Sequence, residues 1–443
     1  MVIQSSKSKY ELMEDLGLLV NEEIKNDFDN LRAKTINEEK IIDALKKGIN
    51  NESVMMNLSS VRGIALGLTE DCNFRCKYCI YSGDYMYARA HSSKQMDCQT
   101  AVKAVDFFLE MINNTFRTRK MNNFDIGFYG GEPLLRFDLL EKVIRGTKEK
   151  KWDNGLAGKF KIDFRITTNG YLLNEKIIDF LAENDVYVDI SLDGPEVEHD
   201  RFRKHRNGSK TWAAVMTNIK KILEKHPEYY RDRVSYQCTI HPLHDLGKIE
   251  HYFKNSNDLF DINKIRFSRV SRQFLKEDIA IRDESAAPER GGLITKSIIE
   301  SSIAGKFNLR NINYQKKLTG SCFPGGEKVF IDTDGKFHIC EKMNPYFPIG
   351  DIEYGFDIDR IKSIIKQYNE EVIKSRCWQC EVWFLCGVCF VHAAIERELK
   401  IECDEIRKGY IALIKNFLYN LEEENEKANI DLSNGTAAYI EQL

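Results

Sequence analysis

Short apolar runs alternate regularly with longer amphipathic stretches between residues 61 and 270, and this alternation constrains the fold most strongly. The short runs have the length and composition of strands, whereas apolar residues in the longer stretches recur about every 3.6 positions, as in helices. Such alternation predicts a parallel sheet, and six units predict a partial (β/α)6 barrel of the TIM type with its chemistry at the carboxyl ends of the strands. The expected strands are residues 63–68, 124–129, 160–167, 186–191, 234–240 and 264–270, and helices are expected at 100–112, 139–148, 175–183 and 212–225.

The composition is that of a folded protein, with 42% hydrophobic and 30% charged residues. The formal charge is 65 − 68 = −3, which provides no overall positive field for a nucleic-acid backbone. No export signal begins the chain, and the nearly uncharged run at residues 382–395 is too short to cross a bilayer. We therefore expect a soluble, cytoplasmic α/β protein with no nucleic-acid or membrane partner.

The twelve cysteines are distributed very unevenly. Cys72, Cys76 and Cys79 form one group, seven more lie between residues 322 and 403, and only Cys98 and Cys238 stand alone. In a reducing compartment, clustered cysteines bind metal more often than they form disulfides. The pattern predicts two separate metal sites, and the two isolated thiols are expected to be buried like apolar side chains.

The first group directly follows the first predicted strand, at the rim where a barrel places its active site. Three thiolates on one short loop can bind three irons of a 4Fe–4S cluster and leave the fourth iron without a protein ligand. The alternative is a structural zinc site, but tetrahedral zinc takes four ligands. No fourth cysteine or histidine lies next to this loop in the sequence.

The C-x3-C-x2-C spacing, with Tyr78 before the last cysteine, resembles the radical S-adenosylmethionine (radical SAM) enzymes. The resemblance implies that the open iron binds S-adenosylmethionine and that one electron cleaves it to a 5′-deoxyadenosyl radical. Tyr78 would then lie against the adenine. Segments at successive strand ends resemble the family's other cofactor contacts, although each alone is an ordinary turn. They are Gly130, Gly131 and Glu132 for the methionine ammonium, Thr168 and Asn169 for the ribose, and Ser191 with Arg203 for the carboxylate.

Arg203 lies in a basic stretch with five Lys or Arg between residues 201 and 210. Such a stretch can also be an RNA-contacting loop. No aromatic platform is interleaved with it, which favours the cofactor interpretation.

The second group resembles the SPASM extension of radical SAM enzymes. Its pattern is C-x12-G-x4-C followed by C-x2-C-x5-C-x2-C and, after thirteen residues, Cys403, with one residue fewer before Cys389 than the family commonly has. The resemblance implies two auxiliary 4Fe–4S clusters, one of which keeps an open iron. One would use Cys322, Cys340 and Cys389, and the other Cys377, Cys380, Cys386 and Cys403. A two-zinc ribbon is the alternative, and His338 and His392 are interpreted as structural.

Glu341 directly follows Cys340, at a position that resembles the catalytic carboxylate of anaerobic sulfatase maturases. It could act as a general base near the substrate. A solvated carboxylate in a turn is the alternative.

SPASM-bearing enzymes act mostly on peptides, and an open auxiliary iron resembles the ranthipeptide and sactipeptide maturases. The resemblance therefore implies an oxidoreductase that installs thioether cross-links in a Cys-containing precursor peptide with a leader, driven by a low-potential donor such as flavodoxin or ferredoxin. The donor cysteine would bind the open auxiliary iron as thiolate, a soft ligand that suits iron. Formylglycine formation and carbon–carbon cross-linking are the enzymatic alternatives. An iron–sulfur electron carrier and a zinc-stabilised peptide-binding module are the alternatives from other classes.

Four regions are expected along the chain. Residues 1–60 form a small N-terminal module with helices near 10–19 and 37–47, which resembles a reduced leader-recognition element. Residues 61–305 form the radical SAM partial barrel, and 306–410 form the loop-rich iron–sulfur SPASM domain. Residues 411–443 form a C-terminal helix and tail, and the amphipathic pattern spans 407–423.

Overall fold

The structure is a computed structural model that describes residues 10–13, 18–21, 38–115, 123–150, 161–241, 243–256, 258–270, 322–377, 380, 389–401, 403 and 407. Cys386, most of the expected tail helix, and the boundary placed at residues 305 and 306 lie outside these ranges. No helix in the described ranges combines the length and the apolar character needed to cross a bilayer.

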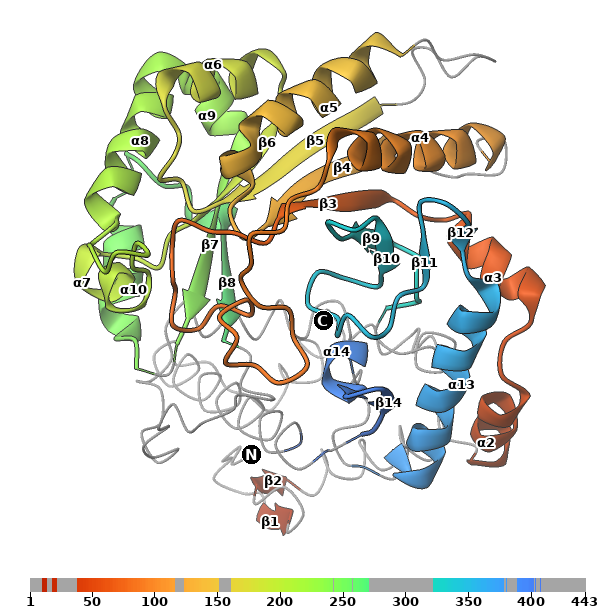
Figure 1. Ribbon diagram of the computed structural model, residues 1–443. Coiled ribbons are helices and arrows are strands. Elements are labelled where there is room, and N and C mark those ends of the chain that lie inside the picture. The colour runs from red at the N-terminus through yellow and green to blue at the C-terminus, as the bar shows by residue number, and fades with distance from the viewer. Residues whose placement is uncertain are drawn as a thin grey trace.

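Six parallel strands form the centre of the molecule, as the alternation predicted (Figure 1). Their order in space follows their order in the chain, which is the arrangement of a partial barrel. The first strand is buried along its whole length because it lies between two neighbours and under helices. These strands are β3 (Gly63–Thr69), β4 (Asn123–Gly130), β5 (Lys161–Thr168), β6 (Tyr187–Ser191), β7 (Val234–Ile240) and β8 (Ile265–Arg269).

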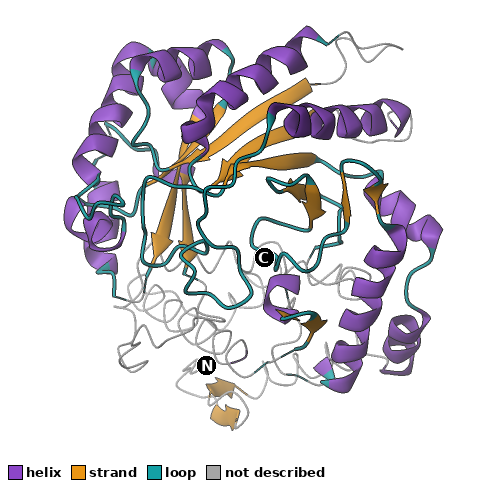
Figure 2. Cartoon of the chain, viewed as in Figure 1, coloured by secondary structure: helices purple, strands orange, loops and turns teal. Residues whose placement is uncertain are grey.

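Helices cover the outer face of this curved sheet, and many loops gather on its inner side (Figure 2). Their apolar stripes form the core against the sheet, and side-chain caps define several of their starts; for example, Asn174 accepts a hydrogen bond from the Ile177 amide at the start of α6. The helices are α4 (Cys98–Thr115), α5 (Phe137–Glu149), α6 (Glu175–Glu183), α7 (Glu196–Phe202), α8 (Trp212–Lys225), α9 (Pro227–Arg233) and α10 (Leu246–Lys254), with short 3-10 turns η2 (Pro133–Arg136) and η3 (Ile262–Lys264).

The second cysteine region is continuous with the barrel sheet. Strand β9 (Lys328–Ile331) pairs in parallel with β3, and antiparallel strands β10 (Lys336–His338), β11 (Gly350–Asp351) and β12 (Gly355–Phe356) extend the sheet to ten strands. Without β9, the β3 edge would present unpaired backbone groups. The sequence pattern did not predict this pairing, because β3 and β9 are far apart in the chain. Helix α13 (Ile358–Lys374), helix α14 (Phe390–Ala393) and the hairpin β13 (Ala394–Ile395) and β14 (Glu398–Leu399) follow.

The N-terminal module differs from the prediction in one respect. The helix expected near residues 10–19 is wrong, since β1 (Tyr10–Met13) and β2 (Leu18–Asn21) form an antiparallel pair. The backbone register places Leu12 opposite Leu19, whereas a helix would have included Gly17 at a cost of about 1 kcal/mol. The second helix is confirmed as α2 (Glu38–Lys47), and α3 (Asn51–Leu58) follows it. Both lie beside α13, where the Asn369 side chain donates to the Leu45 carbonyl at 3.4 Å.

Candidate active site

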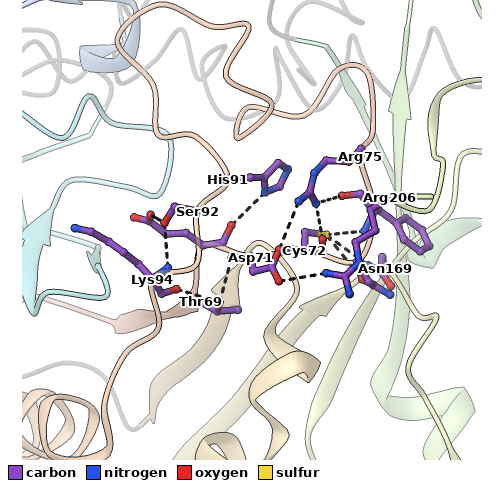
Figure 3. Close-up of polar contacts among 12 residues, drawn as sticks. Thr69, Asp71, Cys72, Arg75, His91, Ser92, Lys94, Asn169 and Arg206 are labelled. Carbon is purple, nitrogen blue, oxygen red and sulfur yellow. Dashed lines mark hydrogen bonds and ion pairs between the residues drawn. The ribbon is translucent and has the colours of Figure 1, made fainter. Parts of the chain in front are cut away.

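The cysteine loop leaves the barrel at the end of β3 through a short polar turn (Figure 3). The Thr69 hydroxyl donates to the Lys94 carbonyl at 3.1 Å and accepts from the Asp71 amide at 3.0 Å. The Asp71 carboxylate in turn accepts from the Cys72 amide at 2.8 Å. These local bonds determine the direction in which the chain carries its first cysteine.

The three thiols of this loop lie in a buried environment. Burial raises the pKa of Cys72 and Cys79, and it raises the pKa of Cys76 to about 12. Buried thiolates therefore need a compensating positive charge, which bound iron supplies. No three His, Cys, Asp or Glu side chains among the described residues are gathered tightly enough for a single metal ion. In an iron–sulfur cluster each thiolate binds a different iron.

Two glycines at the end of β4 allow the backbone to pass directly against the cysteine loop. A Cβ atom on Gly130, whose φ is +136°, would lie 2.2 Å from the Thr69 carbonyl oxygen. A Cβ atom on Gly131 would lie 2.1 Å from the Asp71 carbonyl oxygen. Both positions therefore require glycine, because two loops meet there. This packing requirement is separate from the predicted contact of the glycine backbone with the cofactor.

Glu132 is fully buried and joins the ends of two strands. Its carboxylate accepts hydrogen bonds from the Thr168 hydroxyl at 2.7 Å, the Asn169 amide at 2.8 Å and the Leu134 amide at 3.0 Å. Burial raises the pKa of this carboxyl, and the three hydrogen bonds oppose that rise. The described partners of Glu132 belong to the chain itself, and its contact with the methionine ammonium stays a prediction.

Asn169 links the end of β5 to the cysteine loop. The side-chain nitrogen of Asn169 donates to the side-chain oxygen of Asn73 at 2.7 Å. The same nitrogen lies 3.8 Å from the Cys72 sulfur. The side-chain oxygen of Asn169 accepts from the Tyr171 amide at 3.0 Å. The structure therefore brings Asn169 to the Cys72 thiol, and Thr168 contacts Glu132 beside it. Their contact with the ribose stays a prediction.

Tyr78 forms hydrogen bonds with two charged residues of the segment that follows β6. Its hydroxyl donates to the carboxylate of Asp193, which follows β6, and accepts from Arg203 at 2.7 Å. Asp193 is completely buried, and burial raises its pKa, while Arg203 acts in the opposite direction. Sequence reasoning missed Asp193 as a site residue, although a carboxylate at the end of a barrel strand was a usable signal. Ser191 is the last residue of β6 and is half-buried.

Two buried nitrogen donors beside the cysteine loop lack hydrogen-bond partners among the described residues, and they indicate what kind of ligand the site can hold. The Arg203 Nε and the Asn73 side-chain nitrogen have no hydrogen-bond partner in the described part of the chain. Buried donors of this kind are normally satisfied, so a ligand with acceptor oxygens fits here. A cluster held by three thiolates, with S-adenosylmethionine offering carboxylate and hydroxyl oxygens, matches this donor set.

The second cysteine group is partly described. Cys340 follows β10 and is half-buried; burial, the neighbouring Glu341 and Cys389 each raise its pKa. The assignment of these two thiols to one cluster stays a prediction. Cys377 is buried just after α13, and Cys380 donates its amide to the Cys377 carbonyl at 3.1 Å. Cys322 and Cys403 are also described, and their assignment as ligands stays a prediction.

Arg89 connects the two cysteine regions. It is 8% exposed and donates to the Glu341 carbonyl at 3.3 Å and to the Met343 carbonyl at 2.9 Å. Its other nitrogen lies 3.6 Å from the Asp332 carboxylate, and its guanidinium lies 5.0 Å from the Phe330 ring centre. Sequence reasoning missed Arg89, because its partners lie about 250 positions away and no short motif marks it.

Glu341 is half-buried, and its charge acts on two tyrosines. Burial is the main cause of the raised pKa of Tyr81 and Tyr129, and the charge of Glu341 raises both further. A small pocket at this edge of the barrel is lined in part by Tyr81, Arg89 and Thr333. Glu341 belongs to the turn that Arg89 contacts, and its role as a base for a bound substrate stays a prediction.

Comparisons with known proteins agree with this geometry. Residues 66–254 match the Radical SAM superfamily. An uncharacterized protein of Methanocaldococcus jannaschii is 34% identical over 151 residues, which are 34% of this chain and 45% of that protein. The serine-type anaerobic sulfatase-maturating enzyme of Bacteroides thetaiotaomicron is 24% identical over 347 residues, which are 71% of this chain and 79% of that enzyme.

A solved structure has the same fold. Native anSMEcpe with bound AdoMet and Cp18Cys peptide superposes with a TM-score of 0.52 and 19% identity, covering 82% of this chain and 99% of that one. The match to the M. jannaschii protein spans less than half of that protein's length.

Proposed function

We propose that this chain, a radical SAM enzyme, modifies a peptide and that the product is a thioether between a cysteine sulfur and a carbon atom of the same peptide. The observation that carries the proposal is the placement of the Cys340–Glu341 turn, which Arg89 ties to the rim of the barrel. A substrate between these two regions would contact both cysteine sites. A peptide suits this position, since the similar solved structure has a peptide bound and the similar Bacteroides enzyme matures sulfatases.

The residues divide between the two sites. Cys72, Cys76 and Cys79 would hold the cluster that, with S-adenosylmethionine, supplies a 5′-deoxyadenosyl radical. Arg203 and Asn73 would bind the oxygens of S-adenosylmethionine through their unpartnered nitrogens. The remaining predicted contacts are Tyr78, Gly130, Gly131, Glu132, Thr168, Asn169 and Ser191, and the auxiliary ligands are Cys322, Cys340, Cys377, Cys380, Cys386, Cys389 and Cys403.

Glu341 would accept a proton at the substrate. A thioether formed from a thiol and a C–H bond removes two hydrogen atoms from the peptide. One would go to the adenosyl radical, and the other would leave as a proton and as an electron that an iron–sulfur cluster at the second cysteine region would accept. The carboxylate of Glu341 is the base that we assign to the proton. The electron needed to start each cycle would come from a low-potential donor protein, and a leader segment of the peptide would be held by residues 1–60.

A second candidate is formylglycine formation. The relation to a sulfatase-maturating enzyme along 71% of this chain favours it, and so does the position of Glu341. Both candidates use the same residues on the barrel. They differ in the fate of the substrate sulfur, which a thioether retains and formylglycine formation from cysteine loses.

Mass spectrometry distinguishes the candidates. The enzyme would be reconstituted anaerobically to about twelve iron atoms per chain, the content of three 4Fe–4S clusters, and incubated with S-adenosylmethionine and short cysteine-bearing peptides encoded beside the gene. A thioether lowers the peptide mass by two hydrogens and removes one thiol from alkylation. Loss of sulfur would indicate formylglycine formation, and a two-hydrogen loss with every thiol still alkylated would indicate a carbon–carbon link. Either result contradicts the thioether assignment.

A further inference from the structure

Residues 73–77 of the cysteine loop lie side by side with residues 202–206, which are far away in the chain. The amide of Arg75 donates to the Lys204 carbonyl at 2.8 Å, and the amide of Lys77 donates to the Phe202 carbonyl at 3.1 Å. In the opposite direction, the Arg206 amide donates to the Asn73 carbonyl at 2.8 Å. These backbone bonds bring together four basic side chains that we call the basic patch: Arg75, Lys77, Lys204 and Arg206.

The basic patch has an excess of positive charge. One carboxylate, that of Asp71, lies 3.5 Å from Arg75 and 3.6 Å from Arg206 (Figure 3). Lys77 is exposed and Lys204 is half-buried, and the described residues provide neither with an ion-pair partner. Four cations and one carboxylate leave 4 − 1 = +3 at this patch, on a chain whose formal charge is −3.

Two nearby basic residues, Arg201 and Lys210, do not add to the positive charge of the basic patch. Arg201 lies 3.5 Å from Glu198, and Lys210 lies 2.7 Å from Glu196, so carboxylates neutralise both. The unbalanced charge is therefore concentrated over the cysteine loop. A local field of this kind attracts partners of the opposite sign.

The patch also lies directly beside the thiols. Cys76 stands between Arg75 and Lys77 in the chain, and Arg75 donates to the Cys72 carbonyl at 2.5 Å. A protein docked on these side chains would be separated from the thiols by little more than the loop itself.

We propose that the basic patch docks an acidic, low-potential electron-carrier protein of the flavodoxin or ferredoxin class. The inference rests on the proposed function, because a radical SAM enzyme needs an electron from outside in each cycle. The carrier is oxidised by one electron, which the iron–sulfur site of the cysteine loop takes up, and no bond forms or breaks. Redox encounters bury small areas and depend on charge complementarity for fast association, which a compact patch of net +3 provides.

RNA is the competing occupant of a basic surface. RNA recognition uses exposed aromatic rings on which bases stack. Here Phe74 is 1% exposed, and the rings of Tyr171 and His205 pack against each other at 5.4 Å. The rings beside the patch are thus occupied by one another, and the geometry favours a protein partner.

A binding experiment with matched charge reversals tests the proposal. The reconstituted enzyme carries either Lys77→Glu with Lys204→Glu, or Lys220→Glu with Lys221→Glu on the exposed face of α8, so both variants change the net charge equally. Calorimetric titration with oxidised flavodoxin, and separately with oxidised ferredoxin, measures the dissociation constant at several salt concentrations. We expect the patch variant to bind about tenfold more weakly with a flatter salt dependence, and the α8 variant to bind within about twofold of the unaltered enzyme.

A second measurement separates docking from the chemistry. Chemical reduction by dithionite should give 5′-deoxyadenosine from S-adenosylmethionine equally in the patch variant and the unaltered enzyme, whereas reduction by flavodoxin should be slower in the patch variant. The docking proposal would be overturned if both variants bound the carriers equally weakly, or if neither carrier bound the unaltered enzyme. It would also be overturned if the patch variant lost binding only to a single-stranded RNA oligonucleotide. Absence of 5′-deoxyadenosine with dithionite in the unaltered enzyme would instead contradict the proposed function.

Discussion

The two cysteine regions are built in different ways. The first places all three thiols on one loop, and its supports are backbone carbonyls and short side chains at the ends of neighbouring strands. The second collects Cys340 after β10, Cys377 after α13 and Cys389 at the start of α14, and a buried arginine adds side-chain contacts to the β9–β3 pairing that joins it to the barrel. An added methyl group where the backbones pack closely should therefore destabilise the first region. Removal of the Arg89 guanidinium should destabilise the second region.

Removing one thiol from each region should have the largest effects and should separate their roles. In Cys72→Ala, 5′-deoxyadenosine formation should fall by more than ~100-fold, because the cluster loses one of its three ligands. In Cys340→Ala, 5′-deoxyadenosine formation should persist while peptide modification is lost. Product assays by liquid chromatography measure both, and cleavage retained in Cys72→Ala would contradict the assignment of this loop.

Gly131→Ala tests the backbone contact of the first region. The added methyl group would lie 2.1 Å from the Asp71 carbonyl oxygen, so we expect the free energy of unfolding to fall by about 3 kcal/mol or more, together with poor iron loading. Denaturant unfolding and iron analysis measure the two effects.

Gly146→Ala is the matched control. Gly146 lies in α5 with no atom within 4 Å of its added Cβ, and there alanine should stabilise the helix by about 0.5–1 kcal/mol. An equal change in the free energy of unfolding in Gly131→Ala and Gly146→Ala would show that the close approach of the two loops does not affect stability.

Arg89→Met tests the buried side-chain contact between the barrel and the second region. It removes the donors to the Glu341 and Met343 carbonyls and leaves Asp332 without its cation, so we expect a loss of about 2–3 kcal/mol in unfolding free energy. The electron paramagnetic resonance signal of the auxiliary clusters that we propose should change, whereas that of the cluster proposed at Cys72 should not. Arg89→Lys keeps the charge but cannot reproduce the forked geometry and should restore only part of the loss. An altered signal at the first cluster alone would contradict this division.

A further effect is expected from pH and arises in the barrel. Burial lowers the pKa of His244 to about 4, from an ordinary value of about 6.5. Below pH 6.5 the unfolded chain takes up a proton that folded His244 does not, so stability falls as the pH decreases toward 4, by about 2 kcal/mol at pH 5. Thermal unfolding at pH 7.5 and pH 5 measures this loss.

His244→Gln should have a smaller loss between the same two pH values, since glutamine does not titrate. Equal losses in this variant and the unaltered protein would show that other groups cause the pH dependence.

Much of the barrel was predictable because its signals are local. The apolar runs from 63–68 to 264–270 became β3 to β8, and strand-end residues such as Glu132 and Asn169 do lie beside the cysteine loop. The helix expected near residues 10–19 was wrong, because apolar residues flanking Gly17 suit a hairpin as well as a helix, and cross-strand pairing decided between them.

The sequence by itself determined the parallel barrel and the position of the three thiols at its rim, because strand periodicity and cysteine spacing act over a few residues. Only the tertiary structure decided that β9 continues the barrel sheet, that Arg89 joins the two cysteine regions, and that Asp193 reaches Tyr78. Each of these contacts joins residues more than a hundred positions apart. Such contacts depend on how the folded layers pack, and no short stretch of sequence records them.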